Sequence, residues 1–281
     1  MESVEVKAYA KINLTLYILS KEKGYHMLDS LVASVNLYDK IILKRRRDRQ
    51  IFVTMHGLGS EDIPPEGNNA VRAGKLFVEK FQTDGADIEI YKNIPMGAGL
   101  GGSSADSAGV LNGLSKLYNI GDAPSLSEIA DMTGSDTRYM LSGGWARLFG
   151  RGDRVKKIEG KLNAHIALLV PSESVSTAKC YSLFDRMGNF GGNSDDAERA
   201  VTRGDIKGLA GCLCNALTDP ATSLSGEIQR CIDELKNSNP LAVSMTGSGS
   251  GVYALFENKQ ECVNALSRYK GKARAYILEV K

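Results

Sequence analysis

Residues 95–109 read PMGAGLGGSSADSAG, a glycine turn that runs directly into the start of a helix. The alternating segment 86–91 before the turn predicts a strand, and apolar residues spaced three to four apart behind it predict one buried helix face. We expect the helix to begin near Ser103, with Ser103 and Asp106 forming a capping box. Glycines let backbone N–H groups approach an anion at the positive end of the helix dipole, so the stretch predicts a phosphate site. The residues of the expected buried face are Ala108, Leu111, Leu114 and Leu117 or Tyr118.

Two common phosphate-binding motifs have to be weighed against this stretch. Gly97, Gly99 and Gly102 satisfy G-x-G-x-x-G, and Asp122 stands about twenty residues further on, where a dinucleotide-binding unit has its acidic residue. In such a unit the acidic residue ends a second strand, and the residues before Asp122 have no strand pattern. A Walker loop needs a lysine directly after its last glycine, whereas the next lysine here is Lys116. A positive side chain for the phosphate must therefore come from elsewhere, and the structural alternative is a glycine turn that only packs a helix closely.

Composition limits the classes of protein that this chain can belong to. The 281 residues are 42% hydrophobic and 24% charged with a net charge of +2, a globular balance for one large domain or two ordinary ones. This charge favours neither nucleic acid nor a membrane surface, and the basic run 44–49 is expected to be the solvated tip of a hairpin. No apolar run has the length of a membrane span, residues 1–6 do not resemble a signal peptide, and we expect a cytoplasmic protein.

The cysteines and histidines show no metal or hydrolase motif. The five cysteines include no C-x-x-C pair, which argues against a disulfide framework or a structural zinc site and predicts reduced core thiols. The three histidines stand far apart, and neither G-x-S-x-G nor H-E-x-x-H occurs. No set of metal-ligating residues is therefore expected.

The order of the expected elements favours an α+β fold. Apolar and polar residues alternate over 4–18, which places Lys11 and Asn13 on the same face of a strand. Further strands are expected at 31–37 and 40–43, and a helix at 69–81. Strands that cluster early in the chain argue for α+β rather than a repeated strand–helix alternation.

Residues 125–141 are expected to form a helix, a tight turn (134–136) and a second helix start, and a change of unit is expected near residue 160. Beyond it the expected elements are a strand (165–170), a helix (177–184), a polar glycine loop (188–196), helices, a strand pair around 245–256 that contains a glycine turn (246–251), a helix after 258 and a last strand (275–280).

Three features, in this order, resemble the GHMP family of small-molecule kinases. They are the lysine segment Ala10-Lys11-Ile12-Asn13-Leu14, the glycine–serine loop of residues 95–108, and the C-terminal glycine loop of residues 245–251. Further blocks match one branch of the family and span nearly the whole chain in the family's order. These blocks are Ala8-Tyr9-Ala10-Lys11-Ile12-Asn13-Leu14, Gly24-Tyr25-His26, Gly134-Ser135-Asp136, Gly150-Arg151-Gly152-Asp153 and Val175-Ser176-Thr177-Ala178.

The resemblance implies a two-domain GHMP kinase fold of the α+β class. Residues 1–158 would form the ATP-binding N-terminal domain, like domain 2 of ribosomal protein S5, and residues 159–281 a ferredoxin-like C-terminal substrate domain. In that family the active site lies in the cleft between the two domains. The expected protein is a monomer or a homodimer that binds neither nucleic acid nor membrane.

The branch also implies a reaction, a base and two cofactors. With ATP and Mg²⁺ the protein would phosphorylate a cytidyl sugar alcohol of the non-mevalonate route to isoprenoids. The acceptor would be the tertiary 2-hydroxyl of the methylerythritol unit. Asp136 would accept the hydroxyl proton, a role usually worth ~10²–10⁴-fold in rate. Lys11 would orient the hydroxyl and offset the charge that develops on the transferred group.

The remaining site residues also follow from the resemblance. Asn68 would lie near the adenine, Tyr25 and Tyr181 on either side of the cytosine, His26 at its hydrogen-bonding edge, and Thr177 near the phosphates or the erythritol. The residues expected to bind ATP are Asn68, Pro95, Met96, Gly97, Ala98, Gly99, Leu100, Gly101, Gly102, Ser103, Ser104 and Ala105. Those expected to bind the substrate are Asn13, Tyr25, His26, Thr177 and Tyr181.

Two other functions stay open on the sequence. Thr137 and Arg138 follow Asp136 where the family has a small apolar residue and proline, and Ser103 takes the place of a family glycine. A non-catalytic nucleotide- or metabolite-binding protein on the same scaffold is one alternative. A GHMP kinase for another small alcohol, such as homoserine or mevalonate, is the other.

Overall fold

The computed structural model describes residues 2–60, 67–160 and 162–281, which divide into two compact units. Unit 1 contains the chain up to Ala10, Leu37–Pro95 and Gly101–Gly143. Unit 2 contains Lys11–Asn36, Met96–Leu100 and Gly144–Lys281. Both units are thus discontinuous in sequence, and the chain passes between them several times.

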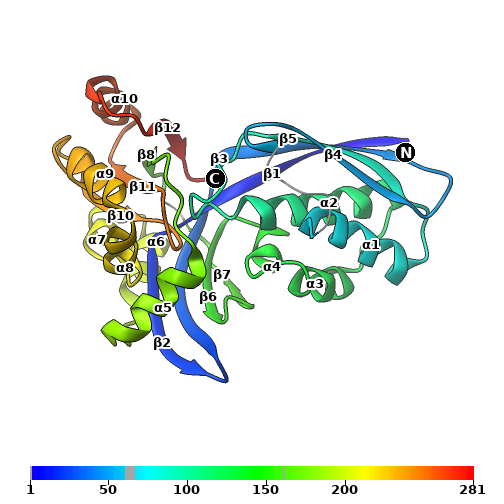
Figure 1. Cartoon of the computed structure of the whole chain (residues 1–281), viewed down its shortest axis with the longest axis horizontal. Helices are drawn as coiled ribbons and strands as arrows, with labels where there is room; N and C mark the ends of the chain where they lie inside the picture. Colours follow the sequence, from blue (N-terminus) through cyan, green and yellow to red (C-terminus); the bar gives the residue numbers. More distant parts are fainter. Residues whose placement is uncertain (1, 61–66, 161) are drawn as a thin grey trace. The chain divides into compact units, whose positions relative to one another are not determined.

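Unit 1 is a sheet with helices on one face (Figure 1). Strand β5 lies between β4, to which it is parallel, and β3, to which it is antiparallel; β1 also pairs with β3. Strands β1 and β3 continue into unit 2. The strands are β1 (Ser3–Asn13), β3 (Tyr25–Arg45), β4 (Ile51–Gly57) and β5 (Ala86–Lys92), and the helices are α1 (Asn69–Phe81), α2 (Gly102–Tyr118), α3 (Ala123–Asp131) and α4 (Thr137–Met140).

Helix α2 packs directly on strand β3 because its inner face carries glycines. A Cβ on Gly113 would come within 2.2 Å of the Leu43 side chain, and one on Gly109 within 2.5 Å of that of Ile41. The expected apolar face is confirmed, since Ala108, Leu111, Leu114 and Leu117 are all buried. The expected helix at 69–81 and the turn and helices of 125–141 are confirmed as well.

Two expectations about the early strands are wrong. The segments 31–37 and 40–43 are parts of one strand, β3, because the polar Asp39 between them is not a break but a buried partner of Lys92. The basic run 44–49 is not a hairpin tip, because β5 separates β3 from β4. The run is solvated and paired, with the Arg46 guanidinium 2.7 Å from carboxylate oxygens of both Asp48 and Asp87.

Unit 2 contains the rest of the strands and helices. The first half of β3 pairs with β2 and β6, and a separate antiparallel sheet has the order β10-β11-β8-β12. The strands expected around 165–170, 245–256 and 275–280 are confirmed in that sheet. The strands are β2 (Thr15–Glu22), β6 (Trp145–Gly150), β7 (Arg154–Lys157), β8 (His165–Val170), β9 (Cys214–Asn215), β10 (Ala242–Met245), β11 (Val252–Phe256) and β12 (Arg274–Glu279). The helices are α5 (Thr177–Met187), α6 (Asp195–Arg203), α7 (Ile206–Gly211), α8 (Thr218–Leu224), α9 (Gly226–Lys236) and α10 (Lys259–Arg268).

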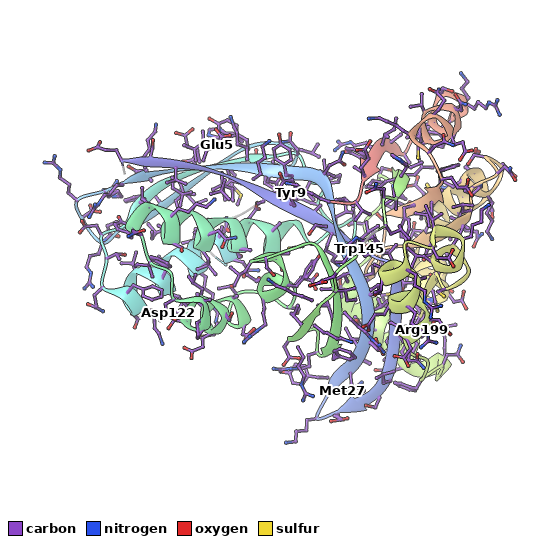
Figure 2. The ribbon with its side chains drawn as sticks, turned by 180° about the vertical axis from the view of Figure 1, so that it is seen from behind. Glu5, Tyr9, Met27, Asp122, Trp145 and Arg199 are labelled. Carbon is purple, nitrogen blue, oxygen red and sulfur yellow. The ribbon has the colours of Figure 1, made fainter. Side chains whose placement is uncertain are left out.

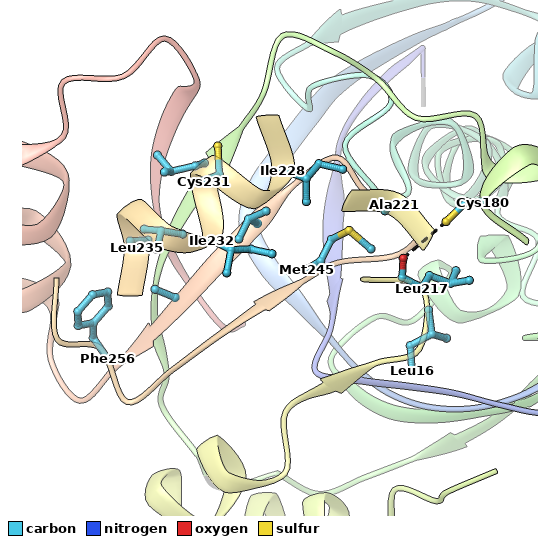
Figure 3. Close-up of a cluster of buried hydrophobic side chains, with 14 of the residues drawn as sticks. Leu16, Cys180, Leu217, Ala221, Ile228, Cys231, Ile232, Leu235, Met245 and Phe256 are labelled. Atoms are coloured by element: carbon cyan, nitrogen blue, oxygen red, sulfur yellow. Dashed lines mark hydrogen bonds between the residues drawn. The ribbon is translucent and has the colours of Figure 1, made fainter. Parts of the chain in front are cut away.

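A hydrophobic cluster joins the sheet of unit 2 to helices α5, α8 and α9 (Figure 3). Phe184, Leu217 and Met245 are among its fully buried side chains. Cys180 lies in the same cluster, where its thiol donates to the Leu217 carbonyl at 3.7 Å and burial raises its pKa to about 11. All five cysteines are free thiols; Cys180, Cys231 and Cys262 are buried as expected of core thiols, whereas Cys212 and Cys214 are only half-buried.

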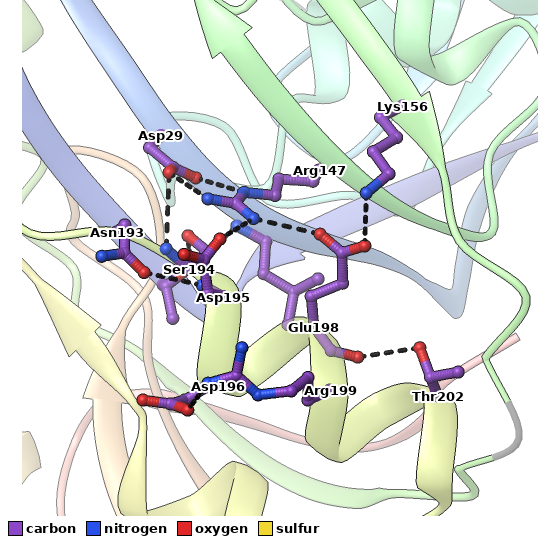
Figure 4. A network of polar contacts seen from close by, with 12 residues as sticks. Asp29, Arg147, Lys156, Asn193, Ser194, Asp195, Asp196, Glu198, Arg199 and Thr202 are labelled. Atoms are coloured by element: carbon purple, nitrogen blue, oxygen red, sulfur yellow. Dashed lines mark hydrogen bonds and ion pairs between the residues drawn. The ribbon is translucent and has the colours of Figure 1, made fainter.

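A buried arginine fastens helix α6 to strands β3 and β6 of unit 2 (Figure 4). The Nε of Arg147 donates to Asp29 at 2.7 Å, and one terminal nitrogen donates to Asp195 at 2.6 Å and Glu198 at 3.1 Å. Because each nitrogen has a carboxylate partner, this buried charge is compensated.

Across the described residues, none of the helices is long and apolar enough to cross a lipid bilayer.

Candidate functional site

In unit 2, residues 96–100 of the first glycine turn pack against the second glycine turn, 246–251. The Ser250 N–H donates to the Gly97 carbonyl at 3.0 Å, and the Gly251 N–H donates to the Ala98 carbonyl at 3.2 Å. Nothing local to the sequence of either turn indicates that the two turns pair.

Gly99 is the closest point of this contact. Its φ of +72° is in the left-handed region, and a Cβ there would lie 2.0 Å from the carbonyl oxygen of Thr246. The Thr246 hydroxyl donates to the Gly99 carbonyl at 3.2 Å. Backbone conformation and space therefore both require glycine at this position.

In unit 1, helix α2 begins without a side-chain cap. Gly101 is its N-cap in the left-handed conformation and makes no capping bond, so the start expected near Ser103 is confirmed to within a residue. The expected capping box is wrong, because the Asp106 carboxylate turns to the buried Lys92 ammonium, 2.5 Å away. The Ser103 hydroxyl accepts a bond from Asn69 at 3.0 Å. Within the described chain the N-cap of α2 therefore offers no side-chain acceptor to the N–H groups of the first turn, which suit an anion.

The structure rejects the dinucleotide-binding alternative. Asp122, labelled in Figure 2, is the N-cap of α3 and accepts the Ser125 N–H at 3.1 Å. It follows the α2 helix rather than a second strand, so the acidic residue of that motif has no counterpart here.

Lys11 and Asn13 share one face of β1, as expected. Both side chains are buried, and the Lys11 ammonium donates to the Asn13 side-chain oxygen at 2.6 Å. The same oxygen accepts the Gly247 N–H at 3.0 Å, and the Asn13 amide nitrogen donates to the Ser30 hydroxyl at 2.8 Å. Asn13 thereby connects the lysine to the second glycine turn.

Asp136 stands at the start of α4 in unit 1, in the tight turn expected there. It is the N-cap residue of α4, although its side chain makes no capping bond. The next two residues have separate environments: the Thr137 hydroxyl is buried without a hydrogen-bond partner in the described chain, and the Arg138 Nε donates to Asp131 at 2.6 Å. The Arg138 guanidinium is thus bound at least partly by a carboxylate other than Asp136.

The residues expected at a cytosine ring come from the start of β3 and from α5. The His26 ring lies on that of Tyr181, with centroids 4.6 Å apart, and its Nε2 is 2.6 Å from an Asp185 oxygen. Tyr25 is 56% exposed, and the Arg151 guanidinium lies 4.7 Å from its ring centroid. Sequence reasoning missed Asp185, which no motif marks.

Two further expected residues also have clear local roles. Thr177 begins α5, and its hydroxyl shares a hydrogen bond of 2.8 Å with that of Ser248 in the second glycine turn. Asn68 caps α1, where its side-chain oxygen accepts the Ala70 N–H at 2.9 Å.

The described residues include no group of three or more His, Cys, Asp or Glu side chains able to hold a metal ion. Mg²⁺ usually takes only one or two carboxylates, together with water and substrate phosphates. A Mg²⁺ ion that arrives with a nucleotide therefore does not require such a group of side chains.

Family models identify the chain. The model for the GHMP kinases N terminal domain matches residues 68–146, and that for the GHMP kinases C terminal matches residues 197–273. The chain belongs to the GHMP kinases. It is accordingly an ATP-dependent small-molecule kinase with the two-domain fold of that family, as expected. The boundary at residues 158 and 159 stays a prediction.

Relatives of this GHMP kinase align with it over nearly their whole length. The protein named 4-diphosphocytidyl-2-C-methyl-D-erythritol kinase from Caldicellulosiruptor saccharolyticus is 37% identical over 97% of this chain and 95% of its own. The protein of the same name from Bacillus cytotoxicus is 33% identical over 95% of this chain and 92% of its own.

Solved structures agree on the fold. A crystal structure of 4-(cytidine 5'-diphospho)-2C-methyl-D-erythritol kinase has a TM-score of 0.83 and 28% identity, and covers 99% of both chains. Homoserine kinase from Cytophaga hutchinsonii has a TM-score of 0.75 at 16% identity over 100% of this chain and 95% of its own, a likeness of fold alone.

Proposed function

We propose that this GHMP kinase transfers the γ-phosphoryl group of ATP to the 2-hydroxyl of 4-diphosphocytidyl-2-C-methyl-D-erythritol, a step of the non-mevalonate route to isoprenoids. The observation that carries the proposal is the 37% identity over 97% of the chain to a protein named for that activity. The glycine turn, the Lys11–Asn13 pair and the contact between the His26 and Tyr181 rings support it, because they have the chemistry that this substrate and ATP require.

Asp136 is the proposed general base. A tertiary alcohol is a poor nucleophile, and removal of its proton in the transition state is worth ~10²–10⁴-fold in rate. Lys11 orients the hydroxyl and offsets negative charge on the transferred group. Asn13 supports this role, since it accepts a hydrogen bond from the Lys11 ammonium at 2.6 Å.

The first glycine turn and the start of α2 bind the nucleotide in this proposal. Phosphoryl transfer depends mainly on positioning and electrostatics, so backbone N–H groups around 97–104 contribute directly to the rate. Mg²⁺ supplies charge neutralisation on the phosphates when bound. Ser103 and Ser104 would help the loop to hold the nucleotide phosphates together with this ion, and Asn68 would lie near the adenine.

The cytidine end is bound by Tyr25, Tyr181 and His26, with Thr177 near the diphosphate or the erythritol. Stacking together with hydrogen bonds to the base edge selects one base, because a wrong base leaves a buried polar group unpaired. The tilted contact between the His26 and Tyr181 rings supports this assignment, because it brings the two side chains together.

The test is turnover by the purified protein. With ATP, Mg²⁺ and the cytidyl substrate, the parent should release ADP and form the 2-phosphorylated product. Asp136→Asn should lower kcat by at least ~10²-fold, the lower range for a general base. Asp122→Asn is the matched control, because asparagine caps a helix as well as aspartate does. An Asp136→Asn variant as active as the parent contradicts the mechanism.

The same assay separates the other functions. Binding of the cytidyl substrate or ATP without ADP release over a panel of alcohols would contradict the proposed reaction. Turnover of homoserine or mevalonate, with no competition by CDP, would support a kinase for another alcohol.

A further inference from the structure

A buried ionic cluster lies in unit 1 immediately before the first glycine turn. Its members are Lys92 at the end of β5, Asp39 on β3 and Asp106 on α2, whose side chains are 3%, 0% and 4% exposed. The Lys92 ammonium donates to Asp106 at 2.5 Å and also to Asp39. None of the three belongs to the proposed catalytic or binding residues.

The cluster holds the chain where it enters the turn. The second oxygen of Asp39 accepts the N–H groups of Asn93 at 2.5 Å and Ile94 at 2.9 Å. These two residues directly precede Pro95, the last residue of unit 1 before the turn. Asp39 therefore fixes the backbone of the entering strand as well as the Lys92 ammonium.

The same cluster holds the chain where it leaves the turn. A Cβ on Gly102, the first residue of α2, would lie 3.3 Å from the Ile94 side chain and 3.7 Å from the Lys92 ammonium. Asp106 lies one helical turn further along α2, and its carboxylate accepts a hydrogen bond from the Lys92 ammonium. Both ends of the segment between Pro95 and Gly102 are thus tied to Lys92.

The charges in the cluster do not balance unless a proton is present. Two carboxylates face one ammonium, and an uncompensated buried charge is costly. The Oδ1 of Asp106 is buried and has no hydrogen-bond partner in the described part of the chain. Burial raises the pKa of Asp106 to about 8; Lys92 opposes this shift, and Asp39 adds to it through its charge and a hydrogen bond. The geometry points the same way, because both oxygens of Asp39 accept hydrogen bonds, whereas one oxygen of Asp106 accepts none among the described residues.

We propose that Lys92, Asp39 and a protonated Asp106 form a positioning cluster, which holds the first glycine turn in the shape that receives the phosphates of ATP. Asp106 acts through the backbone and touches no substrate. The kinetic part of this inference rests on the proposed nucleotide site.

The experiment compares variants of Asp106 in the full chain. Asp106→Leu removes the hydrogen bonds and should raise the KM for ATP at least tenfold, with the KM for the alcohol within twofold of the parent. Asp106→Asn imitates the neutral carboxyl group and should restore the KM for ATP to within threefold. Tyr118→Phe is the matched control on the same helix, because the Tyr118 hydroxyl bonds the Gly85 carbonyl at 2.7 Å, far along α2 from Gly102; its KM for ATP should stay within twofold.

Hydrogen exchange of the free protein separates this proposal from the proposed function. Amides of residues 96–105 should exchange at least tenfold faster in Asp106→Leu than in the parent, with or without activity. Unchanged exchange, or an Asp106→Asn variant as impaired as Asp106→Leu, overturns the positioning cluster. Faster exchange in a protein whose turn gains no protection from ATP would instead contradict the proposed nucleotide site.

Discussion

The side-chain oxygen of Asn13 accepts a hydrogen bond of 2.6 Å from the ammonium of Lys11. It also accepts the backbone N–H of Gly247 at 3.0 Å, and the Asn13 N–H donates to the Thr246 hydroxyl at 3.0 Å. One buried amide side chain therefore sets the position of the proposed catalytic lysine relative to a turn more than two hundred residues later in the chain.

Replacement of Asn13 should affect the rate and the stability together. Asn13→Ala removes the oxygen that accepts hydrogen bonds from the Lys11 ammonium and the Gly247 N–H. The unpaired Gly247 N–H should lower the free energy of unfolding by about 1–3 kcal/mol. We expect kcat to fall about tenfold or more, since a misplaced catalytic group is costly. Denaturant titration and steady-state kinetics measure the two effects. Asn36→Ala, which removes only an exposed bond to the Glu279 N–H, is the control, and an Asn13→Ala enzyme with the parent kcat would refute the role.

Gly99 should not tolerate a side chain. In Gly99→Ala the left-handed backbone costs roughly 1–2 kcal/mol, and the Cβ meets the Thr246 carbonyl at 2.0 Å, so the two glycine turns must separate. The KM for ATP should rise about tenfold, which corresponds to ~1.4 kcal/mol of lost binding. Gly121→Ala is the control, because its Cβ would meet nothing within 4 Å. Equal KM values in the two variants would show that the contact between the turns does not matter for ATP.

Thr137→Val should stabilise the protein. Its buried hydroxyl has no hydrogen-bond partner among the described residues, and removal of such a group relieves about 1 kcal/mol or more of desolvation cost. Thr133→Val is the matched control, because the Thr133 hydroxyl is equally buried and bonds the Ala130 carbonyl at 3.0 Å. The midpoint temperature of thermal unfolding should therefore rise in Thr137→Val and fall in Thr133→Val. A loss of stability in both variants would mean that the Thr137 hydroxyl has a partner in solution.

Asp106 should make the stability of the parent depend on pH. Its pKa is raised to about 8 in the folded chain by burial, against about 3.9 for an unfolded aspartate. At pH values between these two pKa values the folded state holds a proton that the unfolded state has lost. The contribution of Asp106 to the free energy of unfolding is therefore fully present below about pH 4 and is lost as the pH rises through about 8.

Asp106→Asn removes this titration and keeps the shape of the side chain. The free energy of unfolding of the parent, relative to that of Asp106→Asn, should fall from pH 5 to pH 8.5. Urea titrations of both proteins at both pH values measure the difference. The charged partners are Lys92 from β5 and Asp39 from β3. A difference that is the same at both pH values would show that Asp106 is ionised throughout.

Elements with a strong local period were predictable. The helix at 69–81 has the expected bounds because one face is apolar at helical spacing, and the strand at 165–170 has them because it is a short continuous apolar run. Strand β3 was divided in two because Asp39 has a polar side chain, and its pairing with Lys92 spans 53 residues and leaves no local pattern. The false capping box has the same origin, since Asp106 binds Lys92 rather than the start of its own helix.

The sequence by itself determined the α+β class, the family, the glycine turn at the start of a helix, and the shared strand face of Lys11 and Asn13. These follow from the spacing of apolar residues, from the residues that form turns and from the order of the motifs, all of which can be read along the chain. Only the tertiary structure decided that the two glycine turns pack on each other, that Asp185 binds His26, and that Lys92 ties both ends of the first turn. Such contacts join distant residues through burial and charge compensation, which depend on the folded backbone and have no signature at either end alone.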